Sequence, residues 1–253
     1  EFADVYNAYG SKVTVVEALE RILPLEDAEV SKFMERLYKK RGMEIHTGAQ
    51  FKQAKTSKDG VSVTFEDRKG NEQTLDVDYV LSAVGRVPNS EDLGLDSVDA
   101  KVDERGFVLV DRHLSTNVPG LYAIGDVAGH QLLAHKASHE GITCVEHITG
   151  HSDGVVDYDN VPNCTYCHPE VASVGLTELQ AKEMGYDIEV GKFPWAAIGR
   201  AVASGHSDGF IKVIRDKQFS EILGAHIVGP HATELIAEFV VGRHLESTVE
   251  ELE

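Results

Sequence analysis

The segment from Thr116 to Asp126 ends in a glycine and an aspartate, a pair that can hold a polar ligand. Residues 121–124 form a short apolar run that predicts a strand, and this strand would deliver Gly125 and Asp126 at its end. Glycine lets the backbone approach a ligand closely, and an aspartate accepts hydrogen bonds from a sugar-alcohol hydroxyl. An ordinary turn can use the same pair, but the whole pattern, TNVPGLYAIGD, favours a ligand site.

Glu17 is a second candidate because it ends the β-branched run of residues 11–17, which predicts a buried parallel strand. In a dinucleotide-binding fold, the acid at this position accepts hydrogen bonds from the adenosine ribose. A carboxylate there also repels a 2′-phosphate, so it favours NAD over NADP. The glycine-rich turn that precedes such an acid is absent and would lie just before residue 1, so Glu17 taken alone is better explained as a solvated glutamate at a strand end.

Two histidine and cysteine patterns suggest metal or haem chemistry and are better explained otherwise. Cys164, Cys167 and His168 match the attachment motif of c-type haem, but no export signal is visible. A zinc site would need a second pair of ligands, which we do not find. His135 and His139 are spaced as metal ligands can be on a helix, but the zinc-protease order is not present. We therefore expect no metal site and no haem.

The elements that must position these residues follow an α/β order. The stripe of Val30, Phe33, Met34, Leu37 and Tyr38 predicts an amphipathic helix that ends at Gly42. With a helix end over residues 1–10 and the strand at residues 11–17, this indicates the remnant of a βαβ unit. A natural chain seldom starts within a helix, so we expect a fragment of a longer protein.

Further elements follow from local patterns along the chain. We expect a hairpin from residues 61–65 and 73–77, a buried strand at 79–85, short strands at 107–110 and 121–124, and a helix at 134–149. A linker is expected at 151–162, a helix opened by a capping box at 177–180, a hairpin from 210–215 and 221–228, and a last helix at 230–245.

The composition limits the class of protein. The chain has 253 residues, 42% of them hydrophobic, and a formal net charge of -18. No basic face for nucleic acid is apparent, and no apolar run approaches the ~20 residues needed to span a membrane. Only three cysteines occur, so we expect a reducing compartment: the cytoplasm, or the mitochondrial matrix if the source is eukaryotic.

Taken in order, these segments resemble the pyridine-nucleotide disulfide oxidoreductases. Residues 83–89, AVGRVPN, resemble the motif that closes the family's NAD domain, and residues 116–126 resemble its second flavin-binding motif. Residues 133–137, LAHKA, resemble its flavin-ring contact, whereas residues 169–175 and 193–195 resemble its interface domain. The resemblance runs essentially from end to end, in the family's order.

The resemblance implies FAD and NAD as cofactors and assigns residues to each. Toward FAD it implies Asp126 for the ribityl chain, with Gly125 before it, and Ala134 and His135 at the pyrimidine edge of the flavin. The helix that begins near Ala134 would direct its positive end at the negative charge of the reduced flavin. Toward NAD it implies Glu17 for the ribose, together with Ala49, Ala83, Gly85, Arg86 and, near the nicotinamide, Glu1.

The resemblance also implies three parts within an α/β fold. Residues 1–88 would be an N-terminally truncated NAD-binding, Rossmann-like domain. Residues 89–156 would be the return segment of the FAD domain, and residues 157–253 a C-terminally truncated α+β dimerisation domain. The parent would be a homodimer.

Within the family, the enzymes that oxidise dihydrolipoamide with NAD fit best, and lipoyl domains of 2-oxo acid dehydrogenase complexes would be their partners. The redox-active cysteine pair and the C-terminal catalytic histidine segment are absent from the sequence. We therefore assign no catalytic residue and expect the fragment alone to be inactive. Alternatives are a mercuric reductase, a transhydrogenase, a glutathione-reductase-like enzyme, or a non-catalytic dimerisation or nucleotide-binding module.

Overall fold

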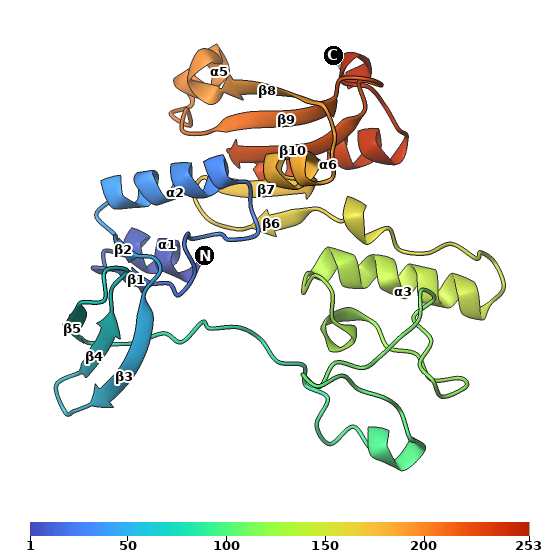
Figure 1. Cartoon of the computed structure of the whole chain (residues 1–253), viewed down its shortest axis with the longest axis horizontal. Coiled ribbons are helices and arrows are strands. Elements are labelled where there is room, and N and C mark those ends of the chain that lie inside the picture. The colour runs from blue at the N-terminus through green and yellow to red at the C-terminus, as the bar shows by residue number, and fades with distance from the viewer. Residues whose placement is uncertain (253) are drawn as a thin grey trace. The chain divides into compact units, whose positions relative to one another are not determined.

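The computed structural model describes residues 1–252 and forms two compact units. The first unit combines Glu1–Ser82 with the chain from Cys164 onward, and the second contains Ala83–Asn163. Figure 1 shows the elements of each unit in chain order. The structure confirms the predicted α/β class.

The N-terminal part of the first unit contains the predicted βαβ remnant. Its elements are α1 (Phe2–Ala8), β1 (Thr14–Val16), α2 (Ala28–Lys40) and β2 (Glu44–His46). β1 and β2 pair in parallel, with Val15 opposite Ile45, and α2 is the crossover between them. Asp27 caps α2 because its carboxylate accepts a hydrogen bond of 2.9 Å from the backbone N–H of Glu29.

An antiparallel sheet of three strands follows: β3 (Gln50–Thr56), β4 (Val61–Glu66) and β5 (Glu72–Val77). The predicted hairpin is β4 with β5 and is confirmed, with Val63 opposite Leu75. Phe65 is fully buried, and its ring centroid lies 5.0 Å from that of His46. β3 was not predicted, because all of its residues are exposed and it has no apolar alternation.

The C-terminal part of the first unit is a sheet of five strands in the order β6-β7-β10-β9-β8. The strands are β6 (Asn163–Thr165), β7 (Glu170–Gly175), β8 (Ile188–Pro194), β9 (Phe210–Asp216) and β10 (Ile222–Gly229). The helices are α4 (Glu178–Glu183), α5 (Gly199–Ala203) and α6 (Ala232–His244), with 3-10 turns η4 (Trp195–Ala197) and η5 (Val249–Leu252). The predicted β9–β10 hairpin, the capping box of Thr177 and Gln180 and the last helix are confirmed.

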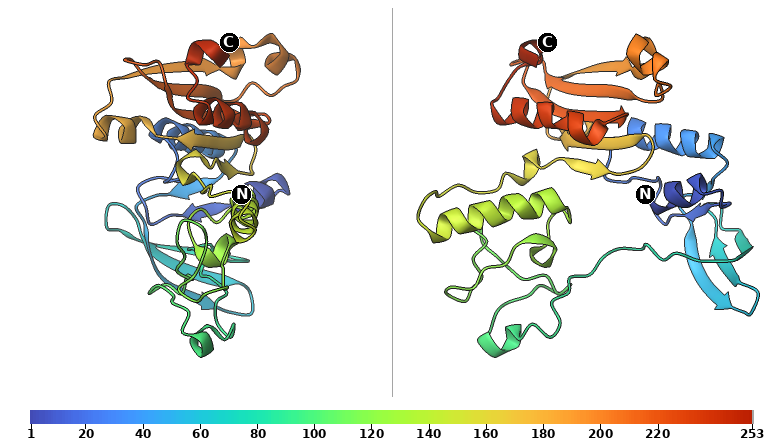
Figure 2. Two further views of the ribbon diagram at one scale, coloured as in Figure 1. Left: turned by 90° about the vertical axis from the view of Figure 1, so that its right-hand side faces the viewer. Right: turned by 180° about the vertical axis from the view of Figure 1, so that it is seen from behind.

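Helices pack on both faces of this sheet. On one face, Val30 and Met34 of α2 belong to a buried cluster with Val171, Phe210 and Val228 of the strands. On the other face, Ala232 and Ile236 of α6 pack with Ala172, Ala225 and Ile227. Successive strand residues point to opposite faces, so β10 is buried along its whole length. Figure 2 shows α6 along the sheet in the view from behind.

A buried lysine ties the start of α2 to the sheet. The Lys212 side chain is 1% exposed, and its Nζ lies 3.0 Å from Asp27 Oδ1, 3.0 Å from Glu29 Oε2 and 2.8 Å from Glu178 Oε2. Burial alone would lower the pKa of Lys212, but hydrogen bonds to Glu178, Asp27 and Glu29 outweigh it and raise that pKa to about 12. Lys212 is therefore charged, and the neighbouring carboxylates balance its charge.

Glu26 lies beside this cluster and is 4% exposed. Burial raises the pKa of Glu26 from 4.5 to about 7; a hydrogen bond from Ser173 opposes this, and the charge of Asp27 adds to it. The Oε2 atom of Glu26 has no hydrogen-bond partner within residues 1–252. Folding therefore shifts Glu26 toward its neutral form.

The second unit has little regular sheet. It contains η1 (Leu95–Val98), η2 (Gly125–Ala128), α3 (Ala134–Ile148) and η3 (Tyr158–Asn160). The predicted helix at residues 134–149 is confirmed as α3. The strands predicted at residues 107–110 and 121–124 are wrong, because these segments form only single antiparallel bridges, Val102 with Val108 and Ser115 with Tyr122.

The buried strand predicted at residues 79–85 is also wrong. Tyr79 is 91% exposed and Val84 is 96% exposed, and the segment has no regular structure. A buried strand needs neighbouring strands and covered faces. Within residues 1–252, no strand pairs with this segment.

Candidate functional site

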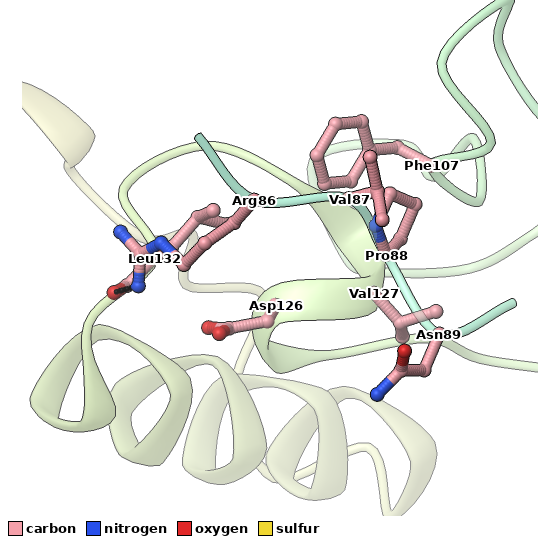
Figure 3. A pocket seen from close by; sticks show the side chains of 8 residues that line it. All are labelled: Arg86, Val87, Pro88, Asn89, Phe107, Asp126, Val127 and Leu132. Carbon is pink, nitrogen blue, oxygen red and sulfur yellow. Dashed lines mark hydrogen bonds between the residues drawn. The ribbon is translucent and has the colours of Figure 1, made fainter. Parts of the chain in front are cut away.

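A cavity of about 410 Å³ lies in the second unit, beside the candidate aspartate. Its lining residues are Arg86, Val87, Pro88, Asn89, Phe107, Asp126, Val127 and Leu132. The Arg86 guanidinium donates a hydrogen bond of 2.8 Å to the backbone carbonyl of Leu132. Figure 3 shows the side chains of Arg86 and Asp126 extending to the same side, toward the loop that carries Leu132.

The backbone at Gly125 and Asp126 suits a ligand contact. Gly125 has φ +73°, a left-handed conformation that favours glycine. Asp126 follows it on η2 and is exposed. The carboxylate of Asp126 has no hydrogen-bond or ion-pair partner within residues 1–252, so both oxygens are free to accept hydroxyl donors.

The turn from Gly125 to Gly129 rests on a buried ion pair. Lys136 Nζ lies 3.0 Å from Glu140 Oε2, and both side chains are 0% exposed. Lys136 also donates to the carbonyls of Gly125 at 3.1 Å and Gly129 at 2.9 Å. Glu140 Oε2 accepts a hydrogen bond of 2.6 Å from the Gly125 N–H, and Glu140 Oε1 accepts one of 2.8 Å from the Tyr158 hydroxyl.

Lys136, Glu140 and Tyr158 were not among the residues predicted for the site. The spacing of Lys136 and Glu140 at i,i+4 on the expected helix is normally a sign of a surface pair, and Tyr158 had no signal in the sequence. Burial raises the pKa of the Tyr158 hydroxyl well above its ordinary value, and the hydrogen bond to Glu140 adds to this. The phenol is therefore a stable donor to the carboxylate.

The first turn of α3 is the next part of the site. Leu133 is the N-cap residue and makes no side-chain cap, so within residues 1–252 the N-cap residue does not satisfy the free N–H groups at the positive end of the helix. Ala134 is exposed there. His135 directs its ring elsewhere, since its Nε2 lies 2.8 Å from the carbonyl of Pro162. Only the backbone of His135 therefore remains at the start of the helix.

Glu17 and Ala49 meet in the first unit. Glu17 follows β1, and its Oε1 accepts a hydrogen bond of 2.8 Å from the backbone N–H of Leu19. The backbone N–H of Ala49 donates to the carbonyl of Glu17 at 3.0 Å, and Ala49 is buried. The strand end therefore holds the Glu17 carboxylate in a fixed position and leaves it half-buried.

The remaining candidates divide between the two units. In the first unit, Glu1 precedes α1, and its Oε1 accepts a hydrogen bond of 2.9 Å from the backbone N–H of Tyr166. In the second unit, Ala83 and Gly85 are exposed and outside any strand, and Gly85 has φ +133°. Arg86 lines the same cavity as Asp126.

The cysteine motif does not form a joint site. Cys164 packs against the cluster under α6, whereas Cys167 packs against the cluster of α2. Both thiols are free, and burial raises the pKa of each. Within residues 1–252, no group of three or more His, Cys, Asp or Glu side chains could hold a metal ion.

No helix within residues 1–252 is long and apolar enough to cross a membrane.

Comparisons with known proteins match most of the chain. The profile described as pyridine nucleotide-disulphide oxidoreductase matches residues 1–141, and the profile of the dimerisation domain of that family matches residues 161–253. A dihydrolipoyl dehydrogenase of Rhizobium etli is 49% identical over 253 residues, which are 100% of this chain and 52% of that protein. One of Cupriavidus necator is 44% identical over 100% of this chain and 53% of its own length.

A solved structure also matches nearly the whole chain. LpdA of Mycobacterium tuberculosis superposes with a TM-score of 0.90 at 29% identity, covering 99% of this chain and 54% of that one. The chain thus spans about half the length of the curated relatives it matches.

Proposed function

Because the chain belongs to the pyridine nucleotide-disulphide oxidoreductase family, we propose that the native protein is a dihydrolipoyl dehydrogenase. It oxidises dihydrolipoamide to lipoamide, and the electrons pass through FAD to NAD. The chain supplies residues that hold the two cofactors, and none of its residues is assigned a direct catalytic role. The structural observation that carries this proposal is the exposed carboxylate of Asp126, which has no partner within residues 1–252 and lies in the same unit as the first turn of α3.

The residues of the second unit fit FAD. Asp126, placed by Gly125, would accept hydrogen bonds from the ribityl hydroxyls. The backbone of Ala134 and His135 would face the pyrimidine edge of the flavin, where the positive helix end stabilises negative charge by up to ~1–2 kcal/mol. Bound FAD supplies the two-electron redox centre between the dithiol and the nicotinamide.

The assignment of NAD as the second cofactor rests mainly on Glu17. Its Oε1 accepts one backbone N–H, so Oε2 is left to accept a ribose hydroxyl, and its charge disfavours a 2′-phosphate. We place Ala49, Ala83, Gly85, Arg86 and Glu1 along the path of the same cofactor. These residues are assigned by their resemblance to the family's motifs, and substitution of Glu17 is the most direct test of the assignment.

We divide the chain into residues 1–88 for NAD, 89–156 for FAD and 157–253 for dimerisation. The match of a dimerisation-domain profile to residues 161–253 supports a homodimer as the active form. Lipoyl domains of 2-oxo acid dehydrogenase complexes are the proposed partners. The free thiols of Cys144, Cys164 and Cys167 support a reducing compartment, the cytoplasm or a mitochondrial matrix.

The test uses the native protein that carries this sequence. We expect it to be yellow with bound FAD and to reduce NAD when given dihydrolipoamide. Asp126→Ala should lose FAD, while Asp96→Ala, an exposed position on η1 of the same unit, should retain it. A native protein that binds no flavin, or that transfers electrons only between NADPH and another disulfide, would reject the proposal.

A further inference from the structure

The buried pair of Lys136 and Glu140 is unusual in its cost and in what it contacts. Both side chains are 0% exposed. Removing two charges from water costs several kcal/mol per ion, and apolar residues of similar volume often stabilise a protein at least as well. A buried pair of this kind is therefore weak evidence for stability, and its contacts are the better guide to its role.

Within residues 1–252, the side-chain hydrogen bonds of the pair go to one turn, to the other member of the pair, or to Tyr158. The three donors of the Lys136 ammonium go to the carbonyls of Gly125 and Gly129 and to Glu140. Glu140 in turn holds the N–H of Gly125, and the Tyr158 hydroxyl holds Glu140. Gly125 is thus bound through both its N–H and its C=O.

The turn that is held in this way carries Asp126. Gly125 precedes the aspartate and Gly129 closes the turn after η2, so the pair fixes the backbone on both sides of it. Lys136 and Glu140 also lie on α3, whose first turn is the other part of the flavin site. One network therefore links the two elements that face the same ligand.

We propose that Lys136, Glu140 and Tyr158 are positioning residues that hold the Gly125–Gly129 turn, so that the Asp126 carboxylate meets the ribityl hydroxyls of FAD. This inference rests on the proposed function, since it takes FAD as the ligand of Asp126. None of the three is assigned a contact with the flavin, because their side chains contact the turn or one another. They act on FAD retention through the turn, and Glu140 contributes most because it holds the Gly125 N–H and also contacts both Lys136 and Tyr158.

The experiment measures FAD release from the native holoprotein, as recovery of flavin fluorescence after dilution. Tyr158→Phe removes one donor and leaves the ion pair intact, and it should accelerate FAD release several-fold. Glu140→Gln removes the charge under Gly125 and should accelerate release by about tenfold to hundredfold, the usual range for hydrogen bonds to charged groups. NAD affinity should not change in either variant.

A double variant separates positioning from stability. Lys136→Met with Glu140→Gln removes both charges, so its thermal unfolding should return close to that of the wild type, while FAD release stays at least about tenfold faster. Hydrogen exchange at the Gly125 amide should be faster in the same variant. The matched control is Lys39→Met, which breaks an i,i+4 pair with Glu35 on the surface of α2 and should leave FAD release unchanged.

The outcomes distinguish the two proposals. If Asp126→Ala releases FAD quickly but Glu140→Gln, Tyr158→Phe and the double variant all retain it like the wild type, the positioning role is wrong and the flavin site stands. If FAD retention simply follows thermal stability across the variants, the network is structural only. A wild-type protein without FAD would overturn the proposed function and this inference together.

Discussion

Replacing Glu26 by glutamine should stabilise the protein at pH 8 and have much less effect at pH 5. Glu26 is 4% exposed and lies beside the Lys212 cluster at the start of α2. Burial is the largest cause that raises its pKa from 4.5 to about 7. The folded protein therefore binds this proton more tightly than the unfolded chain does.

The sign of the pH dependence follows from that difference. A carboxyl whose pKa is raised by folding contributes stability below its unfolded pKa, and this contribution is lost as pH rises through the folded pKa. For Glu26 the loss runs from pH 4.5 to about pH 7. Each tenfold change in proton affinity is worth about 1.4 kcal/mol, so the free energy of unfolding falls by about 3 kcal/mol across this range.

Glutamine matches the protonated carboxyl in shape and does not titrate. Glu26→Gln should therefore have a free energy of unfolding about 3 kcal/mol above that of the wild type at pH 8, and less than about 1 kcal/mol above it at pH 5. Urea unfolding at the two pH values measures both. Glu183→Gln, at an exposed position on α4, is the control and should change stability by less than about 0.5 kcal/mol. An equal gain at both pH values, or no gain at pH 8, would refute the reasoning.

Three further predictions concern other parts of the chain. Lys212→Met should lower the free energy of unfolding by about 3–5 kcal/mol in denaturant titration, because it leaves the buried Asp27 carboxylate without its cation; wild-type stability would contradict this. Gly224→Ala should destabilise by more than about 2 kcal/mol, because its Cβ would overlap the Leu176 carbonyl oxygen; an unchanged melting temperature would count against it. Glu17→Ala should raise the KM for NAD about tenfold and reduce the preference over NADP, and unaltered steady-state kinetics with both nucleotides would remove Glu17 from the site.

Elements with a strong local signal were predictable from the sequence. The apolar stripe of α2, the alternation of β4 and the capping box at Thr177 each depend on residues close in the chain, and the structure confirms all three. Asp126 was proposed as a site residue from its local pattern, and it lies exposed on η2, although the strand expected before it does not form.

Features that depend on distant partners were not predictable. Residues 79–85 have the composition of a buried strand, but burial requires a neighbouring strand, and none of the described strands pairs with them. Lys136 and Glu140 have the spacing of a surface pair, and only the fold of the turn at residues 125–129 over α3 makes them buried. Likewise, nothing local joins Asp27 to Lys212, which is 185 residues away in the chain.

The position of α2 has a consequence for how this chain can be recombined with its relatives. Met34 and Val30 pack in one cluster with Val171, Phe210 and Val228, so α2 and the five-stranded sheet share a single core. A chimera whose crossover falls between residues 46 and 170 inherits half of that core from each parent. The volumes of the two halves must then match, and substitutions on α2 and on β7 are expected to vary together among homologues. A cut made at the apparent domain boundary therefore divides one cooperative unit.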